Sequence, residues 1–113
     1  QELIFMCNWN EKNNKWIPYY QNEYSYIESR DINCIYKVNN WLYIGTAYGL
    51  LVYDLLDDKW TLFNDNNGLA NNIFSIEYYS NNLYLGSNNG IYEFSTMINK
   101  PIKKINYENY QYY

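Results

Sequence analysis

Among the residues whose types and spacing could do chemistry, Asp54, Asp57 and Asp58 form the densest acidic cluster. Two neighbouring carboxylates can act as a general acid and base, or they can hold a calcium ion. The cluster lacks the Asp-x-Asp-x-Asp-Gly order of calcium loops, and Lys59 follows it directly and neutralises part of its charge. The sequence therefore favours a solvated turn here, and we expect neither a metal nor a cofactor.

Histidine is absent from all 113 residues. Triads of Ser, His and Asp, pairs of Cys and His, and zinc sites built on imidazole are therefore excluded within this chain. Cys7 and Cys34 lack a base partner and a CxxC spacing, so neither is a candidate nucleophile. We expect two half-buried thiols on strands, with a Cys7–Cys34 disulfide as the alternative. The protein is predicted not to be an enzyme, and no residue is assigned a catalytic role.

The elements that position these residues follow a repeat. Leu42-Tyr43-Ile44-Gly45-Thr46 recurs as Leu83-Tyr84-Leu85-Gly86-Ser87, at an offset of 41 residues that also relates Gly49 to Gly90. Each copy reads as short runs rich in Tyr, Ile and Val, separated by Asn and Gly turns, which is typical of strands and hairpins. Self-similarity at a period of about 40–45 residues is typical of propeller blades.

The predicted fold is all-β, a β-propeller with blades of four antiparallel strands, of which this chain holds about two and a half. We divide residues 1–113, a single partial propeller, into the end of a preceding blade with its link (1–30), a complete blade (31–71) and a second blade (72–113). The fourth strand of the second blade, expected within 102–107, has the weakest repeat signal. We expect this partial propeller to belong to a larger one or to close with other copies.

Two stretches resemble the two-component-regulator propeller repeats. Residues 68–76, G-L-A-N-N-I-F-S-I, are similar to the G-L-P-S-N-x-V-x-x-I of those repeats, and residues 42–54 are similar to their L-W-I-G-T-x-x-G-L-x-x-Y-D. The departures are Tyr43 and Tyr84 for Trp, Ala70 for Pro and Ser87 for Thr. The resemblance covers residues 31–94. It implies a bladed propeller from the periplasmic or extracellular sensor region of a bacterial histidine kinase, with secretion accessories and extracellular lyases as relatives. A histidine-dependent lyase activity is not expected, because this chain has no histidine.

Composition narrows the range of partners. Eight basic and twelve acidic residues give a formal net charge of −4, and Lys103-Lys104 is the only basic doublet. Phosphate backbones need clustered basic side chains, so nucleic acid is not an expected partner. No run approaches the ~20 apolar residues of a membrane span.

The loops that follow the Gly45 and Gly86 motifs are the candidate binding surface. In an up-and-down blade, the turn between the second and third strands and the link between blades emerge at the same end of the sheet. Amides supply donors and acceptors, and a Tyr ring supplies a stacking surface, a combination suited to a small glycan or a peptide. The alternative is a set of ordinary polar turns. The candidate residues are Thr46, Tyr48, Asn64, Asp65, Asn66, Asn67, Asn71, Asn88 and Asn89.

Two functions are therefore open. The first is a non-catalytic ligand-binding propeller module of a periplasmic or extracellular bacterial protein, as in a two-component sensor. The second is a structural propeller that scaffolds a secretion or surface complex through protein–protein contacts. Excess aromatic residues near the start of the chain favour packing against further blades or a protein partner. They are Trp9, Trp16, Tyr19, Tyr20, Tyr24 and Tyr26.

Overall fold

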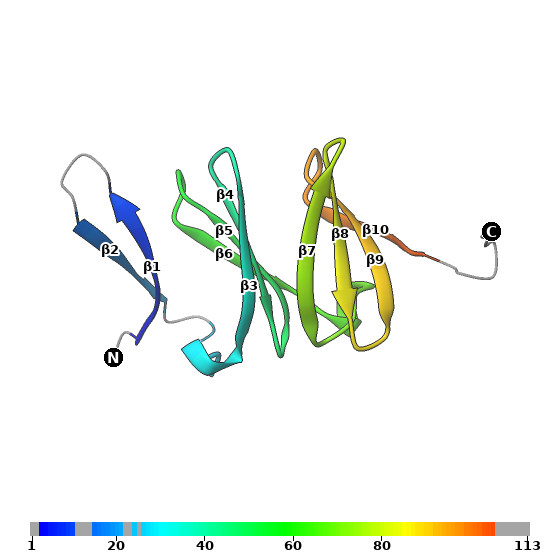
Figure 1. The fold of residues 1–113 in the computed structure, drawn as a ribbon, viewed down its shortest axis with the longest axis horizontal. Coiled ribbons are helices and arrows are strands. Elements are labelled where there is room, and N and C mark those ends of the chain that lie inside the picture. Colours follow the sequence, from blue (N-terminus) through cyan, green and yellow to red (C-terminus); the bar gives the residue numbers. More distant parts are fainter. Residues whose placement is uncertain (1–2, 11–14, 22–23, 25, 106–113) are drawn as a thin grey trace.

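The computed structural model describes residues 3–10, 15–21, 24 and 26–105, and all of its regular layers are β-structure. Figure 1 shows three layers side by side: a hairpin and two four-stranded sheets. The hairpin pairs β1 (Leu3–Asn10) with β2 (Lys15–Gln21) in antiparallel register. The turn expected at residues 11–14 lies outside the described residues. Within the described part of the chain there is no α-helix, and no helix is long and apolar enough to cross a membrane.

Both sheets are antiparallel meanders, in which each strand pairs with the next along the chain. The first sheet consists of β3 (Ile32–Val38), β4 (Trp41–Thr46), β5 (Gly49–Asp54) and β6 (Lys59–Phe63). The second sheet consists of β7 (Ile73–Tyr79), β8 (Asn82–Ser87), β9 (Gly90–Ser95) and β10 (Lys100–Lys104). Two single 3₁₀ turns, η1 (Ser29–Asp31) and η2 (Asp65–Asn67), were not predicted. The all-β prediction and the four strands of residues 31–71 are confirmed, and the last strand begins at Lys100, before its expected position.

Residues that are 41 positions apart in the sequence occupy equivalent positions in the strand pairing of the two sheets. Gly45 lies opposite Leu50 in the first sheet, and Gly86 lies opposite Ile91 in the second. The first strand of each sheet also has a register shift at the same place, between Ile32 and Cys34 and again 41 residues later. A bulge bends a strand and re-aims its side chains. The repeat therefore specifies the bend of each sheet as well as its pairing.

Turn chemistry closes the hairpins. Ser80 and Asn81, between β7 and β8, have φ of 51° and 66°, the left-handed pair that a type I′ hairpin requires. In the equivalent turn of the first sheet only Asn39 has a positive φ, of 54°. Asn tolerates this region better than most residues, because its short side chain bonds locally.

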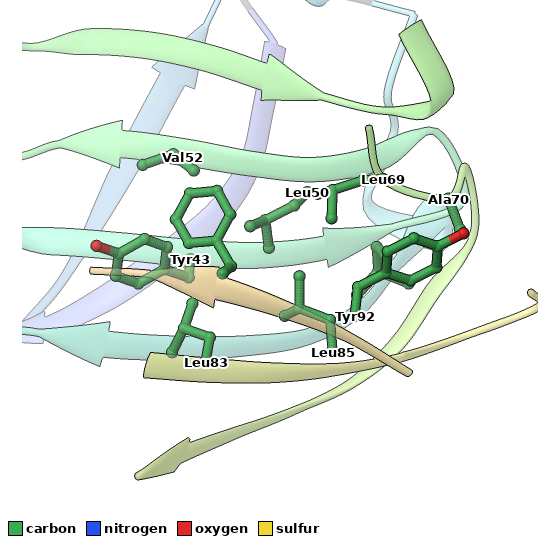
Figure 2. Packing of buried hydrophobic residues seen from close by; sticks show 10 residues of the cluster. Tyr43, Leu50, Val52, Leu69, Ala70, Leu83, Leu85 and Tyr92 are labelled. Atoms are coloured by element: carbon green, nitrogen blue, oxygen red, sulfur yellow. The ribbon is translucent and has the colours of Figure 1, made fainter. Parts of the chain in front are cut away.

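The main hydrophobic core lies between the two sheets. We call the side of the first sheet that carries Tyr43, Leu50 and Val52 the Tyr43 face. It packs against the side of the second sheet that we call the Leu83 face, which carries Leu83, Leu85, Tyr92 and Phe94. Figure 2 shows side chains of the two faces pointing toward one another. Most of these side chains are fully buried, and burying one such apolar side chain is worth about 1.5–3 kcal/mol.

These two faces are not equivalent positions of the repeat. The Leu83 face corresponds, 41 residues earlier, to Leu42, Ile44, Leu51 and Tyr53, which lie on the opposite side of the first sheet. That opposite side, the Leu42 face, forms a second core with Ile27 and Tyr24 of the preceding segment. The sheets are therefore stacked head to tail, with the Leu42-type face of each sheet toward the start of the chain and the Tyr43-type face toward its end. The Tyr43-type face of the second sheet, with Tyr84, Gly86, Ile91 and Glu93, belongs to neither core of the described residues.

The two sheets approach each other closely at Gly45. A Cβ on this residue would lie 3.0 Å from the carbonyl oxygen and the Cγ2 of Ile73, and 2.6 Å from the Cys34 Sγ. The absence of a side chain at this position permits the close backbone approach. The backbones of the two sheets come closest where β7 lies beside β3 and β4.

Candidate functional site

The β4–β5 turn, the link of residues 64–72 and the β8–β9 turn lie at one end of the two sheets, which we call the loop end. Asn72 joins its parts, because its backbone carbonyl accepts from the Asn88 N–H at 3.1 Å and its Oδ1 accepts from the Asn33 Nδ2 at 3.0 Å. Asn33 also donates to the Ile73 carbonyl at 2.8 Å. The two sheets are thus fixed to each other at this end by amide hydrogen bonds, which the sequence did not predict.

The link folds around a capping box. Asn64 is the N-cap of η2, where its Oδ1 accepts from the Asn66 N–H at 2.9 Å, and the Asn67 Oδ1 accepts from the Asn64 N–H at 3.1 Å. Gly68 ends the 3₁₀ turn at φ 90°, where a glycine is favoured. The oxygens of Asn64 and Asn67 are therefore used within the link, while their Nδ2 groups make no hydrogen bond to a described residue. The Asn66 side chain is exposed and likewise bonds to no described residue.

Thr46 has a role inside its turn. Its side chain is fully buried, its Oγ1 donates to the Gly49 carbonyl at 2.8 Å, and the same oxygen accepts from the Tyr48 N–H at 3.0 Å. Ser87 makes the equivalent pair of bonds, to Gly90 at 2.6 Å and from Asn89 at 3.0 Å. Thr46 thus shapes the turn, and its hydroxyl is already engaged twice.

The remaining amides of the loop end are partly engaged. The Asn71 Nδ2 donates to the Asp65 Oδ2 at 3.4 Å, and the Asn88 Oδ1 accepts from the Asn72 N–H at 3.3 Å. Asn89 uses both ends of its amide, donating to the Tyr92 hydroxyl at 2.9 Å and accepting from the Lys104 Nζ at 3.4 Å. The groups still directed to solvent are chiefly Nδ2 donors, so the loop end suits a ligand rich in acceptors.

An aromatic group stands beside these amides. Tyr48 is 41% exposed, and its ring meets that of Tyr26 edge to face at 5.1 Å between centroids. Tyr26 is 52% exposed and also meets Tyr24, at 6.4 Å. The candidate residues therefore lie next to an exposed pair of rings, of which the sequence identified only Tyr48 as part of the surface. Tyr26 was missed as a member because it lies outside the repeat, in the link that precedes the first sheet.

The acidic cluster forms a turn between β5 and β6, as its sequence predicts. The Asp54 Oδ1 accepts from the backbone N–H groups of Leu56 and Asp57, at 3.0 and 3.3 Å. Asp58, at φ 53°, accepts from the Tyr53 hydroxyl at 2.7 Å. Across the described residues, no group of three or more acidic or cysteine side chains is arranged to hold a metal ion.

Cys34 is a free thiol, half-buried on β3 under Gly45. Burial raises the pKa of this thiol, although the backbone of Gly45 offers it a hydrogen bond that acts in the opposite direction. A thiol with a raised pKa is a poor nucleophile. The expectation of a half-buried strand thiol is confirmed for Cys34, while the side chain of Cys7 lies outside what the structure describes.

A scan against protein-family models matches no family to this chain, and searches of curated proteins and of solved structures return no match either. The resemblance to the two-component-regulator propeller repeats thus rests on the repeat motifs alone.

Proposed function

We propose that this chain is a segment of a larger β-propeller and that it serves as a non-catalytic binding module. The observation that supports this most directly is the head-to-tail stacking of the two sheets. Because the Leu42-type face of one sheet packs on the Tyr43-type face of the sheet before it, the same contact can be repeated around a closed ring of blades. The close approach at the first strands fits a ring as well, since blades of a propeller are wedges around an axis.

The module binds its ligand at the loop end. The exposed rings of Tyr26 and Tyr48 supply a stacking surface, and the Nδ2 groups of Asn64, Asn66 and Asn67 supply donors. A glycan or an extended peptide offers the hydroxyl and carbonyl acceptors that such donors need. We place the parent protein in the periplasmic or extracellular part of a bacterial envelope, as a two-component sensor, on the resemblance of residues 31–94 to that repeat family.

Glycan and peptide arrays test this proposal. The purified protein is applied to both, beside Tyr48→Ala and the matched control Tyr79→Ala, which removes a 73% exposed ring at the opposite end of β7. We expect binding on one array, weakened by Tyr48→Ala and unchanged by Tyr79→Ala. Absence of binding on both arrays, by protein whose β-sheet circular dichroism is intact, contradicts the proposal.

A scaffold role is the second candidate, and exposed apolar side chains favour it. Ile35, Leu56, Phe74, Met97 and Ile98 are all at least 47% exposed. Scattered exposed apolar residues are normal. Met97 and Ile98, however, are neighbours in the turn between β9 and β10, and adjacent exposed apolar side chains are typical of a protein contact. Quantitative co-purification with the parent protein separates the two roles, since a scaffold retains a partner at fixed stoichiometry and a sensor does not.

A further inference from the structure

A small pocket lies between the two sheets at the side where they diverge. It is bounded by β6, by the neighbouring parts of β4 and β5, and by the β9–β10 turn of residues 96–99. Its volume is about 150 Å³. An apolar cavity of about this size holds a benzene ring, so the pocket accommodates one six-membered ring. Its lining residues are Trp41, Val52, Asp54, Lys59, Thr61, Phe63 and Asn99.

The lining is divided into an apolar floor and a polar rim. Trp41, Val52 and Phe63 form the floor, and all three lie on the Tyr43 face. The rim carries one carboxylate and one ammonium, Asp54 and Lys59, so it has no net charge. Thr61 and Asn99 complete the rim with a hydroxyl and an amide. A pocket of this kind selects a neutral ring with one apolar side and several hydroxyl groups.

The rim groups are available to a ligand. Asp54 uses Oδ1 for its turn, and its Oδ2 bonds to no described residue. The Lys59 ammonium makes no ion pair or hydrogen bond within the described part of the chain. Asn99 accepts from the Tyr43 hydroxyl at 2.5 Å through Oδ1, which fixes its amide and leaves Nδ2 as a donor. The rim therefore offers both acceptors and donors beside an indole ring.

The second sheet forms with different residues at the positions equivalent to part of this lining. Trp41 corresponds to Asn82 in the second sheet, Val52 to Glu93 and Asp54 to Ser95. The Leu42 face, by contrast, stays apolar in both copies, since its four positions are equivalent to those of the Leu83 face. The residues that form the pocket are thus particular to this one position between sheets.

We propose that this pocket binds a single pyranose ring of a neutral sugar, with the apolar side of the ring on Trp41 and its hydroxyl groups on Asp54, Lys59 and Asn99. This site is separate from the loop end and does not depend on it. A peptide is a poorer occupant, since the pocket holds one ring and exposes no row of backbone groups for a strand.

An NMR titration tests the site. Methyl glycosides of glucose, galactose, mannose and N-acetylglucosamine are added singly to the isotope-labelled protein, with p-cresol as an apolar ring of similar size. We expect a saturable shift of the Trp41 indole N–H with at least one glycoside. Asp54→Asn keeps the size of the side chain, and Trp41→Phe keeps its apolar character. Each variant should weaken binding by about tenfold or more. Phe74→Ala, at an exposed position of β7 away from the pocket lining, should leave the shift of the Trp41 indole N–H unchanged.

Two results overturn the proposal. One is the absence of any saturable shift with all four glycosides. The other is binding of p-cresol alone, which would mean that the cavity recognises apolar rings and that the rim does not select hydroxyl groups. Either result leaves the loop-end proposal standing, because the array experiment measures a different surface through Tyr48.

Discussion

Gly45 and Ile73 are in contact across the two sheets: a Cβ on Gly45 would lie 3.0 Å from both the carbonyl oxygen and the Cγ2 of Ile73. One glycine without a side chain thus sets the distance between β4 and β7. Its counterpart Gly86 has no such neighbour, since a Cβ there would meet only the Ser75 side chain. The two equivalent glycines therefore differ in their surroundings, because Gly45 contacts the neighbouring sheet and Gly86 contacts only its own sheet.

Gly45→Ala should destabilise the protein more than Gly86→Ala. The added methyl group of Gly45→Ala meets the backbone of Ile73 and the Cys34 sulfur, and forced overpacking costs about 1–3 kcal/mol. In Gly86→Ala the exposed Ser75 hydroxyl can rotate away. Thermal unfolding of both variants measures the difference, and equal losses would show that the sheets do not approach each other at Gly45.

Tyr43→Phe should change the dependence of stability on pH. Burial, followed by the influence of Tyr78, raises the pKa of Tyr43 from 10.0 to about 12. The folded protein therefore keeps this proton while the unfolded chain loses it, and stability falls as pH rises from 10 toward 12. Each unit of pKa difference corresponds to about 1.4 kcal/mol. The free energy of unfolding should therefore fall by on the order of 2–3 kcal/mol between pH 10 and pH 12.

The comparison of wild type with Tyr43→Phe isolates this effect from the other tyrosines. Urea unfolding at pH 8, 10 and 11 gives the two curves. We expect them to converge above pH 10 and to meet near pH 11, where wild type has lost about 1.4 kcal/mol. At pH 8 the variant should be less stable by about 1 kcal/mol, because it lacks the hydrogen bond to Asn99. Parallel curves across the whole range would contradict the raised pKa.

Thr46→Val should destabilise the β4–β5 turn while keeping the shape of the side chain. It removes the hydroxyl that bonds to Gly49 and Tyr48, and an unsatisfied buried group costs about 1–3 kcal/mol. Thr61→Val, on an exposed position of β6, is the matched control and should change the free energy of unfolding little. If Thr46→Val is as stable as wild type, the turn does not depend on this hydroxyl.

Phe94→Ala should cost about 3–5 kcal/mol, the usual range for a large aromatic side chain removed from a core. Phe94 is fully buried and contacts both Tyr43 and Phe63, at 5.8 and 5.2 Å between ring centroids. Phe74→Ala removes the same side chain from a site that is 50% exposed and should cost much less. Chemical denaturation measures both, and similar losses would place Phe94 outside the core.

The strands could be predicted from the sequence because their signals are local. These signals are the alternation of Tyr and Ile, the paired Asn residues and the position of Gly45. Each can be recognised within a few residues of sequence. The repeat also indicated that the turns after Gly45 and Gly86 would lie at one end. The features that could not be predicted depend on contacts between distant residues, such as the hydrogen bonds of Asn33 to Asn72 and of Tyr43 to Asn99.

The candidate site illustrates the same limit. Thr46 looked like a surface residue, but its burial depends on how the turn folds back on itself. Tyr26 could not be assigned to the surface because its partner Tyr48 is 22 residues away along the chain. For the pocket a signal did exist, since Trp41 and Asp54 depart from the repeat at positions equivalent to Asn82 and Ser95.

The head-to-tail stacking of the two sheets is the central claim, and nuclear Overhauser effects between them test it most directly. The Hα protons of Gly45 and the γ2-methyl group of Ile73 should give a cross-peak, as should the rings of Tyr43 and Phe94. The absence of both, in a protein that shows the cross-strand peaks of Tyr43 with Val52, would contradict the stacking and with it the proposed propeller.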